Sequence, residues 1–63
     1  MTKFEMAKEI LQNSSVTNIS EVRFCDRVHY HTKTWIEMSY NRVMNADERD
    51  KKSVADEIMN WLK

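Results

Sequence analysis

The chain contains no glycine and no proline among its 63 residues. At average usage of roughly 7% and 5%, a chain of this length would hold about four glycines and three prolines. The lack of glycine excludes Gly-rich phosphate loops and nucleotide-binding fingerprints, and the lack of proline excludes polyproline segments. Any residue in the left-handed conformation must then be an asparagine, aspartate, lysine or serine.

Cysteine is nearly absent as well, since Cys25 is the only one. No intrachain disulfide can form, and a lone thiol is typical of a reducing compartment. The segment after Met1 is charged and not apolar, so we expect no secretory signal. No stretch approaches the ~20 apolar residues that a membrane span requires. These features predict a cytoplasmic protein that does not enter a membrane.

Neither sign of charge dominates, because ten lysines and arginines balance ten aspartates and glutamates. Nucleic-acid-binding domains are usually basic overall, so the composition removes the simplest argument for that function. A chain of this size buries only about 60% of the surface that it exposes when unfolded. We therefore expect one small domain, residues 1–63, with a small core.

The first helix is predicted over residues 3–12. Thr2 and Glu5 have the spacing of a capping box, in which each side chain bonds the other's backbone N–H. Apolar residues at helical spacing follow, and Asn13 is the expected left-handed residue at the end of the helix.

The last helix is predicted over residues 46–62, with Asn45 as its N-cap and acidic residues in its first turn. Trp61 lies on the apolar stripe of this helix, with Val54, Ile58 and Leu62, and is expected in the core.

The segment from residue 22 to residue 44 alternates between large apolar and polar residues. The apolar positions are Val22, Phe24, Val28, Tyr30, Ile36, Met38 and Tyr40. Alternation with period 2 in two runs separated by Thr32–Thr34 predicts two half-buried strands and a short turn.

The predicted fold class is thus α+β: an α-β-β-α domain with an antiparallel hairpin and two helices packed on one face. Open strand edges, or a helix face, would let two copies pair, so we expect a homodimer. The alternative is an all-α helical bundle, whose stripe would be Val22, Cys25, Val28, Trp35, Tyr40 and Val43. That stripe leaves Phe24, Tyr30 and Met38 out, and the segment is rich in residues that favour strands.

The outward face of the predicted hairpin is the candidate partner-binding surface. It collects Arg23, Arg27, His29, His31, Lys33 and Trp35. Trp35 is the expected hot spot, because exposed tryptophans dominate interface energetics. The alternative use of this face is to hold phosphates, as nucleic-acid-binding sheets do. The interpretation without a binding function is a face exposed to solvent that carries cross-strand ion pairs, such as Arg27 with Glu37.

Metal binding and catalysis are not expected. Cys25, His29 and His31 form C-x3-H-x-H, but residues four apart on a strand are ~13 Å apart, so only the two histidines could share an ion. No nucleophile can be paired with a base from the spacing, and 63 residues leave little volume for a substrate pocket. We expect no cofactor, no small-molecule substrate and no enzymatic activity.

The sequence therefore predicts a small interaction module that binds and modulates a protein partner. In its general features, and in no specific residue, the chain resembles the accessory proteins that bacteriophages and mobile elements use to bind host factors. The alternative function is a nucleic-acid-binding regulator that uses the basic face of the hairpin.

Overall fold

The computed structural model describes all 63 residues and contains four α-helices and no β-strand. The helices are α1 (Lys3–Asn13), α2 (Glu21–Tyr30), α3 (Lys33–Asn45) and α4 (Glu48–Leu62). The α+β prediction, with its α-β-β-α order and antiparallel hairpin, is therefore wrong. The all-α alternative describes the chain, and the two segments expected to be strands are α2 and α3.

The predicted capping box at the start of α1 is confirmed. The Glu5 N–H donates to Thr2 Oγ1 at 3.1 Å, and the Thr2 N–H donates to Glu5 Oε1 at 2.8 Å. The backbone N–H of Thr2 holds the pKa of the Glu5 carboxyl below its usual value. The end of α1 differs from the prediction, because no residue has a positive φ and Ser14 leaves the helix in an extended conformation.

Hydroxyl caps that we did not predict begin α2 and α3. Ser20 Oγ accepts from the N–H of Arg23 at 3.4 Å, and Thr32 Oγ1 accepts from the N–H of Trp35 at 3.1 Å. Each bond satisfies one of the free amides at a helix start.

The start of α4 also differs from the prediction. Asn45 is the last residue of α3, and the N-cap of α4 is Asp47, which makes no side-chain capping bond. The last helix is therefore two residues shorter than expected at its start.

The strand prediction for residues 22–44 is wrong because residues four apart lie on the same face of a strand and also on the same face of a helix. Phe24 and Val28 are buried one helical turn apart, and both also lie on even positions. Val22, Tyr30 and Met38 decide between the two periods, since a strand would bury them. They are 81%, 77% and 65% exposed, as the helical period requires.

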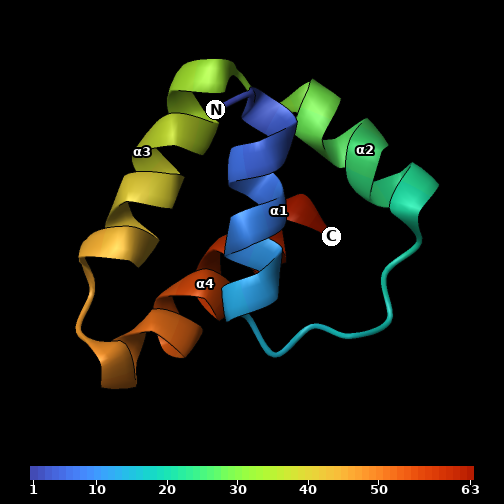
Figure 1. Cartoon of the computed structure of the whole chain (residues 1–63). Coiled ribbons are helices and arrows are strands. Elements are labelled where there is room, and N and C mark those ends of the chain that lie inside the picture. The colour runs from blue at the N-terminus through green and yellow to red at the C-terminus, as the bar shows by residue number, and fades with distance from the viewer.

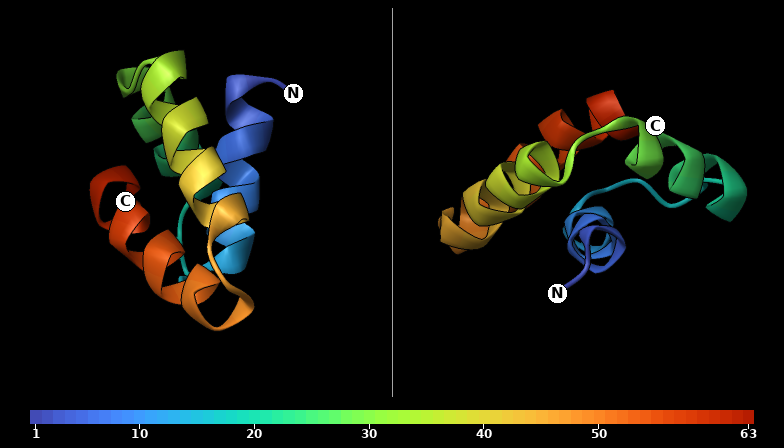
Figure 2. Two further views of the ribbon diagram at one scale, coloured as in Figure 1. Left: turned by 90° about the vertical axis from the view of Figure 1, so that its left-hand side faces the viewer. Right: turned by 90° about the horizontal axis from the view of Figure 1, so that it is seen from above.

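The core is formed by side chains from all four helices. Its buried apolar residues are Met6, Ala7, Ile10, Phe24, Val28, Ile36, Val43, Ala55, Ile58, Met59 and Leu62. Seen from above, α3 and α4 overlap along one limb of an arc, α2 forms the other limb, and α1 lies on the concave side (Figure 2). In Figure 1, α1 is at the centre, with α3 on one side and α2 on the other.

Three further contacts hold α2 and the long link before it in place. Phe4 of α1 meets Phe24 of α2 edge to face, with 6.0 Å between ring centroids. Lys3 Nζ donates to the carbonyl of His29 at 3.3 Å. In the link between α1 and α2, Ser15 donates to the Asp56 carboxylate of α4 through its N–H at 2.7 Å and its hydroxyl at 2.9 Å.

None of the four helices combines the length and the apolar character that a membrane crossing demands.

Candidate functional site

The C-terminal end of α4 is held by two side chains that emerge from α2 and the residue that follows it. Arg27 Nη2 donates to the backbone carbonyl of Trp61 at 2.9 Å, and His31 Nε2 lies 3.0 Å from the same oxygen. A carbonyl can only accept, so His31 Nε2 carries a proton in this arrangement. Cationic and N–H groups are favourable here because the carbonyls at a helix C-terminus are partly negative.

Aromatic rings surround these two contacts. The His31 ring stacks on Trp35 with centroids 4.2 Å apart and planes at 19°. The Tyr30 and His31 rings meet edge to face with centroids 5.6 Å apart, and the Arg27 guanidinium lies 5.3 Å from the Tyr30 ring centroid, at cation–π distance. We call this cluster of Arg27, Tyr30, His31, Trp35 and Trp61 the aromatic end.

The aromatic end is partly fixed and partly open to solvent. Arg27, His31 and Trp35 are half-buried, and Trp35 packs against the core. Tyr30 is largely exposed, and the side chain of Trp61 is 63% exposed although its carbonyl is bonded. Large exposed aromatic rings beside fixed polar groups are a feature of protein interfaces.

The structure brings together three of the six residues proposed as the partner-binding face. Arg27, His31 and Trp35 share the aromatic end. The remaining three are exposed and lie elsewhere: Lys33 begins α3, Arg23 lies one turn before Arg27, and His29 borders the hollow beside α1. The six were grouped by strand alternation, whereas a helix distributes them around its circumference.

Two residues of the aromatic end were assigned to the core by the sequence, and both assignments are wrong. Tyr30 was placed on the apolar strand face, and Trp61 on the apolar stripe of the last helix. At 100° per residue, Trp61 lies about 110° from the centre of the stripe formed by Ala55, Ile58, Met59 and Leu62. The sequence alone does not distinguish this stripe from the equally narrow one through Val54, Ile58, Trp61 and Leu62.

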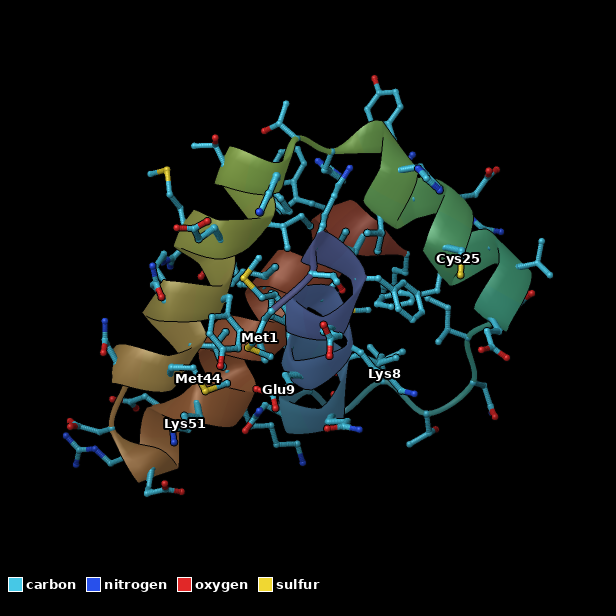
Figure 3. The ribbon with its side chains drawn as sticks, turned by 45° about the horizontal axis from the view of Figure 1, so that its top comes forward. Met1, Lys8, Glu9, Cys25, Met44 and Lys51 are labelled. Atoms are coloured by element: carbon cyan, nitrogen blue, oxygen red, sulfur yellow. The ribbon has the colours of Figure 1, made fainter.

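A second polar contact joins α1 to α3 on another side of the molecule. Glu9, labelled in Figure 3, accepts a hydrogen bond from the Tyr40 hydroxyl, and this bond raises the pKa of Tyr40 above its ordinary value. A carboxylate acceptor stabilises the protonated phenol and so raises its pKa. The contact between Glu9 and Tyr40 supports the packing of α3 on α1, and we assign it no role in binding or catalysis.

The argument against a metal site at Cys25, His29 and His31 assumed that they lie on a strand, and the structure shows that they do not. Cys25 and His29 are one turn apart on α2, and His31 turns to the Trp61 carbonyl. No group of three or more His, Cys, Asp or Glu side chains is arranged to hold a metal ion.

Comparison with protein-family models, with curated proteins and with solved structures finds no match to this chain. The assignment of a function therefore rests on the arrangement of its residues.

Proposed function

We propose that the chain is a small interaction module that binds a protein partner through the aromatic end and acts by binding alone. The single observation that carries this proposal is the exposure of Tyr30 and Trp61 beside the fixed Arg27–His31–Trp35 contacts. Tryptophan, tyrosine and arginine are the residue types most enriched among interface hot spots. The single cysteine favours a reducing compartment, so we propose a cytoplasmic partner.

The rigidity of the aromatic end supports this use. His31 is held between the Trp35 ring and the Trp61 carbonyl, and Arg27 is held by that carbonyl and the Tyr30 ring. Side chains that are fixed before binding lose less conformational entropy when a partner arrives. The exposed Tyr30 ring, which contacts both His31 and Arg27, therefore loses little conformational entropy when a partner buries it.

The partner's chemistry follows from the groups on this surface. Exposed rings require an apolar counterpart, and the charge of Arg27 favours acidic side chains around it. We therefore propose a partner surface that is apolar at its centre and acidic at its rim. Phosphate binding is the less favoured use, because Arg27 is the one lysine or arginine of the aromatic end and the net charge of the chain is zero.

The test compares two single variants in affinity capture with the purified chain. Trp61→Ala removes an exposed ring and keeps the backbone carbonyl that Arg27 and His31 contact. Val22→Ala is the matched control, because Val22 is also exposed and lies eight residues before Tyr30, about 12 Å along α2. Proteins captured from a cell lysate are identified by mass spectrometry, and their affinities are then measured with purified components.

We expect Trp61→Ala to weaken binding about 30-fold, the effect of losing a hot spot of about 2 kcal/mol, and Val22→Ala to leave it unchanged. Equal affinity of Trp61→Ala and the wild type would overturn the proposal. So would micromolar binding of mixed-sequence DNA or RNA at low salt that disappears at high salt, because it would establish phosphate binding instead.

A further inference from the structure

Cys25 and His29 form a pair of metal-ligating side chains that the aromatic end does not use. On a strand they would be too far apart to share an ion, but on α2 they occupy positions i and i+4. We propose that this pair is one half of a site for a thiophilic cation of the Zn²⁺ class. The other half is the same pair from a second copy of the chain.

The first support is the spacing. Side chains at i and i+4 of a helix have Cβ atoms about 5–6 Å apart. A tetrahedral zinc with one thiolate and one imidazole ligand holds the two donor atoms roughly 3.5 Å apart, which this spacing allows. Two ligands at i and i+4 on one helix face are the arrangement of the H-E-x-x-H zinc motif.

The second support is that both side chains border the same open hollow. A hollow of about 400 Å³ on the outer side of α2 is lined by Glu21, Val22, Cys25, Asp26 and His29. Figure 3 shows Cys25 on α2, at the opposite side of the view from Met44 and Lys51. Cys25 is half-buried and His29 is exposed, so an ion reaches both without unfolding the helix.

The third support is the charge around the pair. Glu21 and Asp26 bring two carboxylates to the outer hollow, which favours a cation over an anion. Lys3 borders the neighbouring hollow between α1 and α2 and donates to the carbonyl of His29. We therefore place the ion on the outer side of Cys25 and His29, away from Lys3.

A single chain cannot complete this site. A closed zinc site has four ligands, and no three ligating side chains of one chain are arranged around a common point. His31 lies on the other side of the buried Phe24–Val28 stripe, where it contacts the Trp61 carbonyl, and so does not reach the ion. Two chains that meet at this hollow supply a Cys₂His₂ set, and the exposed Val22 of each lies where the contact would bury it.

This site is separate from the aromatic end. At 100° per residue, Cys25 and His29 flank the buried Phe24–Val28 stripe on one side, and Arg27 and His31 flank it on the other. Failure of metal binding would therefore leave the proposed partner binding untouched, and the reverse also holds.

The test is titration of the reduced chain with Co²⁺ and then Zn²⁺, with a phosphine reductant present to prevent a Cys25 disulfide. We expect thiolate-to-cobalt absorption with a tetrahedral visible spectrum that Zn²⁺ displaces, at one ion per two chains. Sedimentation should give a mass near twice 7.6 kDa with Zn²⁺ and a return to the monomer with a chelator.

Matched variants identify the ligands. Cys25→Ser and His29→Ala should each abolish the spectrum and the zinc-dependent dimer, while His31→Ala should retain both. No thiolate absorption below about 100 µM Co²⁺ would overturn the proposal. Saturation at one ion per chain without dimerisation, an unchanged response of His29→Ala, or a dimer that survives the chelator would overturn it as well.

Discussion

At the scale of single residues, the carbonyl oxygen of Trp61 is contacted by Arg27 and His31, two residues that the sequence predicted to bind a partner. Both contacts lie at the end of α4. The Arg27 guanidinium and the His31 ring N–H therefore first satisfy the Trp61 carbonyl within the chain. The helix ends there, so no further turn supplies a backbone donor for this carbonyl. The same contacts hold the neighbouring rings of Tyr30 and Trp35 in place.

Removing Arg27 should cost stability, because the Trp61 carbonyl loses a charged donor at a helix C-terminus. We expect Arg27→Ala to lower the free energy of unfolding by about 1–2 kcal/mol. Arg23→Ala is the control, since Arg23 lies one turn earlier on α2 and its side chain makes no hydrogen bond or ion pair within the chain. Its effect should stay within about 0.5 kcal/mol. Equal losses in denaturant unfolding would show that the Trp61 contact contributes nothing.

Asp56 should make the stability of the chain sensitive to acid. The N–H and hydroxyl of Ser15 hold the pKa of the Asp56 carboxyl below its usual 3.8. A carboxyl with a lowered folded pKa stabilises the fold above its unfolded pKa and loses that contribution as the pH falls through the folded value. Between about pH 5 and pH 2.5, the melting temperature of the wild type should fall more steeply than that of Asp56→Asn.

Ser15→Ala gives the intermediate case for this acid dependence. The variant keeps the Ser15 N–H bond to Asp56 and loses the hydroxyl bonds. Its melting temperature should fall with a slope between those of the wild type and Asp56→Asn. Parallel slopes for all three proteins would exclude a contribution of the Asp56 contact to acid sensitivity.

At the scale of the elements, the first and last helices of the chain could be predicted from local chemistry, and the second and third could not. The Thr2–Glu5 capping box locates α1, and an apolar stripe bounded by polar residues locates α4 within two residues. For α2 and α3, β-branched and aromatic residues favoured strands, and tertiary packing overrode that preference. Ser20 and Thr32 were the missed signals, because each is a preferred N-cap residue directly before a helix.

Ile36 and Met38 distinguish the helical period of α3 from the strand period. A strand would bury both, while the helix buries Ile36 fully and leaves Met38 exposed. Ile36→Ala should cost about 2–5 kcal/mol, and the milder Ile36→Val about 0.5–1.5 kcal/mol if the alanine variant does not fold. Met38→Ala should change the free energy of unfolding by no more than about 0.5 kcal/mol. A cost for Met38→Ala that matches the cost at Ile36 would favour the strand period.

At the scale of the whole molecule, the absence of glycine and proline fits the fold. No residue adopts a positive φ, so the chain requires no glycine, and each helix ends in an extended residue or at the chain terminus. The candidate site was predictable only in part, since the sequence proposed Arg27, His31 and Trp35 together but assigned Tyr30 and Trp61 to the core. Those two depend on how α2 and α4 meet, which local patterns do not encode.

The helical fold also removes one reason to expect self-association. Pairing of open strand edges was a basis for predicting a homodimer, and the chain has no strand. A homodimer is now proposed only through Cys25 and His29 with a bridging ion. In the absence of metal and partner, we expect the purified chain to be a monomer.

Far-UV circular dichroism of the purified chain tests the helical fold, on which the aromatic end depends, most directly. The four helices have 11, 10, 13 and 15 residues and cover 49 of the 63 positions, so we expect about 78% helix. If residues 22–44 formed a hairpin, only α1 and α4 would remain, with 26 helical residues or about 41% of the chain. A spectrum near that lower value, with a strand component, would contradict the account.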